Sequence, residues 1–202
     1  NKIIIANFQG GKMSTLICLI RHGQTDWNQQ FLIQGRFDIP LNNEGKKQIN
    51  QTICRLNAYN IHWDLFLSSP LLRAKETCQI IKEHLGYQKE EIIIRDQLIE
   101  REFGEADGLK ITDTVYERIL NDDYQGMEKS TIIRKRAYDE MLALDHIYPN
   151  KKILIVTHSH FIKALFIQLD QKITFKSSLA NGSLNFVEID KGKICLLYTS
   201  DA

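Results

Sequence analysis

Residues 15–23 read Thr15-Leu16-Ile17-Cys18-Leu19-Ile20-Arg21-His22-Gly23, and this stretch decides the fold. Its first six residues have little polarity and no alternation, which predicts a strand buried on both faces. Such strands are typical of parallel α/β sheets, whose ligands bind beyond the carboxyl ends of the strands. Arg21 and His22 stand at such an end, and Gly23 leaves room for a turn and for a ligand. Arg-His-Gly also fits the ordinary end of a strand, so its value as evidence for a ligand site depends on the rest of the chain.

Three further apolar runs repeat the pattern, at 64–67, 92–94 and 153–157. The first exits into Ser-Ser-Pro, and Arg73 follows in the first turn of a predicted helix. The second leads to a loop that carries Glu100, and the third is followed directly by His158. Because the carboxyl ends of parallel strands lie along one edge of a sheet, we expect two arginines, two histidines and a carboxylate to meet there.

The rest of the chain predicts the other elements of one α/β domain with a mostly parallel sheet. Helices are expected at 43–58 with Asn43 as cap, after Pro70 with that proline in the first turn, near 112–121, near 130–146 and after His158. A C-terminal hairpin is expected from strands at 184–189 and 194–198. We set residues 1–12 aside as an added tail, because Asn7-Phe8-Gln9-Gly10-Gly11 resembles the remnant of an engineered protease site.

Composition narrows the class of protein. The 202 residues contain 26 Lys and Arg against 25 Asp and Glu, a formal charge of +1, which argues against a dedicated nucleic-acid binder. The four cysteines are dispersed without a C-x-x-C pair, are expected to be small core residues, and favour a reduced, cytoplasmic setting. Apolar runs are all too short to span a membrane, so we expect no membrane partner.

The predicted cluster has the chemistry of a phosphate site. Guanidinium groups match phosphate oxygens in geometry and charge, and histidines add further donors. The same positive field is expected to lower the pKa of His22 and leave a neutral imidazole that can attack phosphorus. Glu100 would then act as general acid toward the leaving oxygen.

At this point the sequence resembles the histidine phosphatase superfamily, the phosphoglycerate mutase-like group. The matching pieces are Arg21-His22-Gly23-Gln24-Thr25 with Trp27-Asn28, Gln34-Gly35 with Asp38, Pro40 and Leu41, Ser68-Ser69-Pro70-Leu71-Leu72-Arg73-Ala74, Leu98-Ile99-Glu100-Arg101 with Phe103-Gly104, Val156-Thr157-His158, and Asn181-Gly182-Ser183. They occur in family order over about 14–198, which we take as a single histidine phosphatase-like domain with a small helical cap insertion at about 105–135.

The resemblance implies a three-layer α/β/α sandwich and a phosphohistidine intermediate on His22. Arg21, Arg73 and His158 would bind the phosphoryl group, and Glu100 would be the proton donor. Cationic side chains would take the place of a metal, so no metal or cofactor is implied.

The same resemblance implies substrate contacts around this centre. Asn28 would assist phosphoryl binding, and Gln34 and Gly35 would line the entrance. Arg101 is also assigned to the substrate. Ser159 stands where the family usually has glycine, so it would narrow the pocket or add a donor.

Two departures concern the rim and the acid. The family often carries Trp-Glu-Gly where this chain has Ala106-Asp107-Gly108, which puts the shape of the substrate rim in question. Glu102 is a second candidate acid, two residues from Glu100. The family register favours Glu100.

The function predicted is hydrolysis of a small phosphorylated metabolite, with specificity in 29–40 and 105–135. The alternative is a 2,3-bisphosphoglycerate-dependent phosphoglycerate mutase. The mutases resembled here carry a longer insertion between the histidines than the 136 residues from His22 to His158, with basic residues for the substrate carboxylate. The basic residues available are Lys110, Arg118, Lys129, Arg134 and Lys135, in no arrangement that matches.

Two further alternatives stay open. The chain could be a phosphate-ligand binder that has kept the fold without catalysis. A metal site from His158, His160 and His22 is disfavoured, because His160 is expected on the next helix, facing outward. The oligomeric state is not predicted, although the C-terminal hairpin could present an edge to a second copy.

Overall fold

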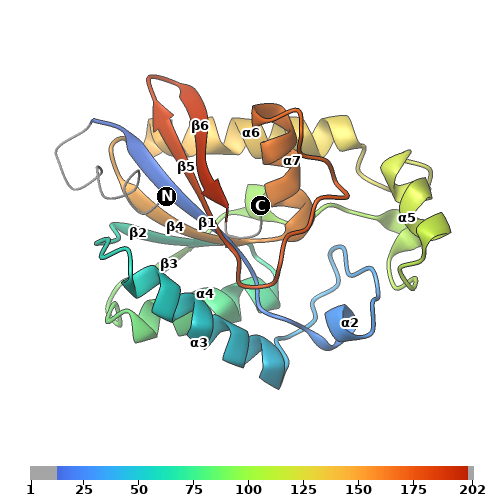
Figure 1. Ribbon diagram of the computed structural model, residues 1–202, viewed down its shortest axis with the longest axis horizontal. Helices are drawn as coiled ribbons and strands as arrows, with labels where there is room; N and C mark the ends of the chain where they lie inside the picture. Colours follow the sequence, from blue (N-terminus) through green and yellow to red (C-terminus); the bar gives the residue numbers. More distant parts are fainter. Residues whose placement is uncertain (1–12, 200–202) are drawn as a thin grey trace.

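The computed structural model describes residues 13–199, and a six-stranded sheet forms its centre (Figure 1). The strands are β1 (Thr15–Arg21), β2 (Leu65–Ser68), β3 (Ile92–Ile94), β4 (Lys152–Thr157), β5 (Leu184–Asp190) and β6 (Lys193–Thr199). Their order across the sheet is β3-β2-β4-β1-β5-β6. The first four run parallel, whereas β5 is antiparallel to β1 and β6 to β5. The predicted α/β class with a mostly parallel sheet is confirmed.

Helices cover both faces of the sheet and make three layers (Figure 1). Helices α3 (Asn43–Asn57) and α4 (Leu72–His84) pack on one face, and α6 (Ser130–Ile147) and α7 (Ser159–Leu169) on the other. Within β1, Leu16, Cys18 and Ile20 belong to the hydrophobic core on the side of α3 and α4. Ile17 and Leu19 belong to the core on the side of α6 and α7. Because both faces of β1 are buried, its sequence is apolar without alternation.

The strand register places the functional segments side by side. Arg21 pairs with Thr157, and the His22 amide donates to the Thr157 carbonyl at 3.0 Å. On the other side of β4, the Ser69 amide donates to the Val156 carbonyl at 3.0 Å. The ends of β1, β4 and β2 therefore lie at one level of one edge, as the parallel arrangement predicts.

The helix boundaries correct three expectations. Asn42 rather than Asn43 caps α3, because its side chain accepts from the Gly45 amide at 2.8 Å. Pro70 lies before Leu71, the N-cap residue of α4, and therefore outside the first turn of that helix. A short helix, α2 (Asp26–Gln29), lies inside the segment expected to be only a loop.

One other expectation is also corrected. Cys54 is exposed, so it is not a core residue, whereas Cys18 and Cys78 are buried. Gly23 also has a packing role that was not expected, because a Cβ there would stand 2.8 Å from the Gly45 carbonyl oxygen at the start of α3, and the expected approach of a ligand there stays a prediction.

The segment expected to form a cap carries the 3₁₀ turn η3 (Gly104–Ala106) and helix α5 (Asp113–Leu120) before α6 begins. It shares a small core made of Ile33, Phe103, Ala106, Ile119, Tyr124 and Met127. Another 3₁₀ turn, η2 (Asp96–Leu98), precedes Glu100. No helix within 13–199 is both long and apolar enough to cross a membrane. The tail expected at 1–12 lies outside the described residues, and the cytoplasmic setting stays a prediction.

Candidate active site

Two histidines meet at the edge where β1 and β4 end. The ring centroids of His22 and His158 are 5.2 Å apart, and the planes are tilted by 58°. His22 follows β1, and His158 is the N-cap residue of α7, directly after β4. His22 is only 3% exposed and His158 is fully buried. The sheet therefore holds two imidazoles from distant parts of the chain in one buried place.

Hydrogen bonds orient the His22 ring. Its Nδ1 lies 2.7 Å from the Gly23 carbonyl oxygen, which can only accept, so we assign the ring proton to Nδ1. Nε2 then carries the lone pair, and Arg73 Nε donates to it at 3.2 Å. Burial lowers the pKa of His22 well below its usual value, and the charges of Arg73 and Arg21 lower it further. The predicted lowering of the His22 pKa is confirmed, although burial contributes more to it than the neighbouring charges do.

Arg73 connects the nucleophile candidate to the entrance loop. It projects from the first turn of α4 and is 1% exposed. Its Nη1 donates to the Phe37 carbonyl at 2.7 Å and its Nη2 to the Gly35 carbonyl at 2.8 Å. Burial lowers the pKa of Arg73 to about 10, so the guanidinium remains charged at neutral pH.

Arg21, Asn28 and Asn181 surround the other side of His22. The Arg21 guanidinium donates to the Leu179 carbonyl, which holds it at the end of β1. Asn181 Nδ2 donates to the His22 carbonyl at 2.9 Å and lies 3.4 Å from Asn28 Oδ1. Sequence reasoning quoted Asn181 within a motif but gave it no role. Its position indicates that it fixes the backbone of His22.

His158 is held by the end of β2. Its Nε2 lies 2.7 Å from Ser69 Oγ, whereas its Nδ1 is buried without a hydrogen-bond partner among residues 13–199. Burial, and then the charge of Arg73, lower the pKa of His158 well below its usual value. The site therefore contains a neutral imidazole with one unused polar atom.

Glu100 lies at the N-terminus of α7. Its Oε1 accepts from the amides of Arg101 at 2.9 Å and Phe161 at 3.2 Å, and its Oε2 accepts from the His160 amide at 3.2 Å. Because the His158 side chain makes no capping bond, Glu100 supplies the acceptors that the first turn of this helix requires. The candidate acid is thus also a helix cap.

The pocket in front of these groups has a volume of about 220 Å³. Eight of the predicted site residues line it: Arg21, His22, Asn28, Gln34, Gly35, Arg73, Glu100 and Ser159. Two do not. His158 is buried beside His22, and Arg101 is fully buried, with its Nε donating to the Glu128 carbonyl at 2.8 Å. The structure therefore gives Arg101 a packing position rather than a place in the pocket wall.

Comparison with known proteins places this geometry in a family. A model of the histidine phosphatase superfamily (branch 1) matches residues 17–201. The chain belongs to the histidine phosphatase superfamily. The predicted family is thereby confirmed.

Two relatives of this chain carry different names. Uncharacterized phosphatase PhoE from Bacillus subtilis (strain 168) is 35% identical over 182 residues, which cover 89% of this chain and 91% of PhoE. A 2,3-bisphosphoglycerate-dependent phosphoglycerate mutase from Parvibaculum lavamentivorans is 30% identical over 193 residues, with 88% and 92% covered. Both a protein named as a phosphatase and a mutase are therefore at least 30% identical to this chain, with the former the more similar of these two.

Solved structures of phosphoserine phosphatase from Entamoeba histolytica are also similar. The complex with 3-phosphoglyceric acid has a TM-score of 0.77 at 27% identity and covers 93% of this chain and 98% of that one. A mutant in complex with phosphoserine has a TM-score of 0.76 at 26% identity, with 92% and 96% covered.

Sequence reasoning missed several residues that line the pocket of this histidine phosphatase. His160 was expected to face outward from the helix, but it is only 6% exposed and stacks on Phe175 with ring centroids 4.8 Å apart. Lys163 and Tyr116 also line the pocket. Lys163 follows Ser159 by four residues on α7, so the helical repeat was a signal that could have found it.

The carboxyl groups of Glu102 and Asp107 form a pair beside the pocket. Glu102 makes an ion pair with Arg36 at 3.4 Å, and neither acid is among the lining residues. Burial raises the pKa of Asp107 to about 7, and the neighbouring Glu102 adds to the rise. The acid that faces the pocket is therefore Glu100.

None of the five basic residues considered for a mutase lines the pocket. Four bond elsewhere: Arg118 to Asp123, Lys129 to the Asp122 carbonyl, Arg134 to Gln168 and Lys135 to Asp139. Over the described part of the chain, no cluster of three His, Cys, Asp or Glu could hold a metal ion.

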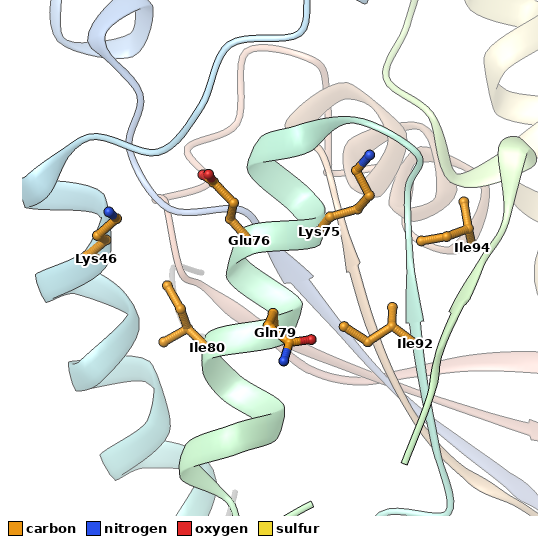
Figure 2. A pocket seen from close by; sticks show the side chains of 7 residues that line it. All are labelled: Lys46, Lys75, Glu76, Gln79, Ile80, Ile92 and Ile94. Carbon is orange, nitrogen blue, oxygen red and sulfur yellow. The ribbon is translucent and has the colours of Figure 1, made fainter. Parts of the chain in front are cut away.

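A second hollow lies between α3, α4 and the edge strand β3 (Figure 2). Lys46, Lys75, Glu76, Gln79, Ile80, Ile92 and Ile94 line it. Its lining contains no histidine or arginine. Most of its side chains come from α4 and from β3, the strand at the edge of the sheet. We therefore take the pocket at His22 as the candidate active site.

Proposed function

We propose that this histidine phosphatase is a phosphomonoesterase that acts on a small phosphorylated metabolite through a phosphohistidine intermediate on His22. The observation that carries the proposal is the neutral His22 ring, whose Nε2 lone pair faces Arg73 at 3.2 Å in a pocket of about 220 Å³. A pocket of this size suits a metabolite rather than a macromolecule or a large cofactor.

The first step is transfer of the phosphoryl group to His22. Arg21 and Arg73 would hold its oxygens, and the unused Nδ1 of His158 would donate to one of them. Nε2 attacks phosphorus as the bond to the leaving oxygen breaks, and Glu100 gives that oxygen a proton. Because the two arginines supply positive charge, the scheme requires no metal.

The second step is hydrolysis of the phosphohistidine. Water attacks phosphorus, Glu100 takes a proton from that water, and the P–N bond breaks to return the neutral imidazole and inorganic phosphate. Glu100 lines the pocket and can therefore serve both steps, whereas Glu102 is engaged with Arg36 outside it. Glu100 would therefore act first as acid and then as base, and Glu102 would take part in neither step.

The similarity of phosphoglycerate mutases makes a mutase the second candidate. In that reaction the phosphoryl group returns to another oxygen of the substrate instead of passing to water. The absence of the five cap basic residues from the pocket wall favours the phosphatase. The Entamoeba enzyme, crystallised with phosphoserine and with 3-phosphoglyceric acid, suggests small phosphorylated acids as first substrates to try.

Inorganic phosphate release distinguishes the candidates. The purified protein is incubated with p-nitrophenyl phosphate, phosphoserine and 3-phosphoglycerate, and 3-phosphoglycerate is tested both without and with added 2,3-bisphosphoglycerate. A phosphatase releases phosphate and, after an acid-free quench, carries an acid-labile label from radioactive substrate. Isomerisation of 3-phosphoglycerate without release would establish the mutase instead. A folded protein that never takes up label would be the non-catalytic binder.

A further inference from the structure

Lys163 is a half-buried cation in the pocket wall that the proposed reaction does not use. It projects from α7, one turn after Ser159. Its Nζ donates to the Phe175 carbonyl at 3.0 Å, and within the described chain it makes no ion pair with a carboxylate. An ammonium group has three N–H donors, so two of them have no acceptor among the described residues. A partly desolvated charge in this state favours an anionic ligand.

The position of Lys163 is fixed by its surroundings. Tyr116, from α5, donates through its hydroxyl to the same Phe175 carbonyl at 2.6 Å. The His160 ring stacks on the Phe175 ring with an interplanar angle of 13°. One carbonyl thus holds a lysine from α7 and a tyrosine from the cap, which limits the movement of the Lys163 side chain. A preorganised donor of this kind discriminates between ligands better than a free surface lysine.

The charge of Lys163 interacts with those of two other groups that line the pocket, Arg21 and Glu100. The charges that lower the pKa of His22 are those of Arg73 and Arg21, whereas the charge of Lys163 lowers the pKa of His160. Burial, and then the charge of Arg21, lower the pKa of Lys163 to about 8, and the charge of Glu100 opposes them. Lys163 therefore lines the same pocket as Glu100, the proposed proton donor, and is mostly charged at neutral pH.

Resting on the proposed function, we propose that Lys163 determines specificity by binding a carboxylate on the leaving group of the phosphomonoester. A single ammonium with two unused donors matches one carboxylate, whereas a second phosphate would call for a further cation. A pocket of about 220 Å³ leaves room for a short carbon chain between the two anionic groups. The substrate class is a phosphorylated small hydroxy or amino acid.

Two substrates that differ in this group alone provide the test. 3-Phosphoglycerate carries a carboxylate where glycerol 3-phosphate carries a hydroxymethyl group. Lys163→Met keeps the length and the apolar stem but removes the charge, and Lys163→Arg keeps the charge. For Lys163→Met, kcat/KM for 3-phosphoglycerate should fall about 10- to 100-fold, as expected for a charged hydrogen bond. For glycerol 3-phosphate and p-nitrophenyl phosphate it should change less than about 3-fold, and Lys163→Arg should restore most of the loss.

Equal losses on all three substrates in Lys163→Met would overturn the proposal, because Lys163 would then act on the phosphoryl group or on the fold. A wild-type preference for glycerol 3-phosphate over 3-phosphoglycerate would also overturn it and leave the phosphatase standing.

Binding to inert protein separates the two proposals. His22→Ala and His22→Ala/Lys163→Met are titrated calorimetrically with both compounds. Tighter binding of 3-phosphoglycerate that disappears in the double variant supports the carboxylate site, even if the wild type proves to be a mutase. Equal affinity for both compounds in His22→Ala refutes it.

Discussion

Asp107→Asn should make the stability of this protein less dependent on pH. The Asp107 carboxyl is half-buried beside Glu102, and its pKa is raised from 3.8 to about 7. Burial is the main cause, the Glu102 carboxyl adds to it, and Arg36 and Arg73 oppose it. Asparagine has the same shape and stays neutral at every pH, so the variant isolates the ionisation of this one group.

The sign of the effect follows from proton binding. Between pH 4 and 7 the folded protein holds a proton on Asp107 that the unfolded chain releases, so this carboxyl makes unfolding easier as pH rises. From about pH 5 to pH 7 the difference spans two pKa units, at most ~2.7 kcal/mol. Because Asp107 is only half-buried, solvent screening reduces this to about 1 kcal/mol. Above pH 7 both states are ionised and the effect is constant.

Urea unfolding of wild type and Asp107→Asn at pH 5 and pH 8 measures this directly. The free energy of unfolding of the variant minus that of wild type should be about 1 kcal/mol larger at pH 8 than at pH 5, with equal m values. Asp139→Asn is the matched control, because Asp139 is an exposed partner of Lys135 on α6. The same relative stability at both pH values would refute the reasoning.

Three further predictions concern the pocket. His22→Ala should lower phosphate release at least about 1,000-fold and abolish acid-labile labelling, while its circular dichroism spectrum stays unchanged. His146→Ala, at an exposed histidine, should change neither phosphate release nor labelling. Labelling that survives in His22→Ala would show that another residue is the nucleophile. Glu100→Gln should slow hydrolysis of alkyl phosphates far more than of aryl phosphates in steady-state assays, and equal losses would contradict its role as acid. Gly35→Ala should lower the free energy of unfolding by about 1–3 kcal/mol, because φ is +47° and a Cβ would stand 2.0 Å from Asp107 Oδ1. Gly86→Ala is the control, because its φ is +90° but a Cβ there would meet open space. Thermal melting should show a smaller loss of stability for Gly86→Ala than for Gly35→Ala.

The part of the fold that could be predicted from the sequence is the part set by burial on both faces. The strands at 15–21 and 152–157 have no alternation because helices cover both sides, and their parallel pairing puts Arg21 and Thr157 at one level. Once the strands are parallel, the residues that follow them must meet at one edge. The apolar runs of these two strands were therefore enough to predict that His22 and His158 lie close together.

Other features depend on long-range contacts that no local pattern contains. His160 looked like an outward helix residue because its inward partner, Phe175, lies fifteen residues away in an irregular segment. Arg101 resembled a substrate ligand by motif, but the Glu128 carbonyl that holds it comes from a separate loop. The helix α2 was hidden because its capping box between Thr25 and Asn28 has little apolar periodicity around it.

The bonds of Arg73 show why the entrance loop can be in place before a substrate arrives. Within the described residues, three of its five N–H donors are used, and their acceptors are His22 Nε2 and the carbonyls of Gly35 and Phe37. Two remain for phosphoryl oxygens, so a phosphate can bind without breaking either bond to the loop. Only the bond from Nε to His22 must yield, because attack on phosphorus requires that lone pair. In the proposed reaction the guanidinium would therefore keep its bonds to the loop and would release His22 only when a phosphoryl group takes its place.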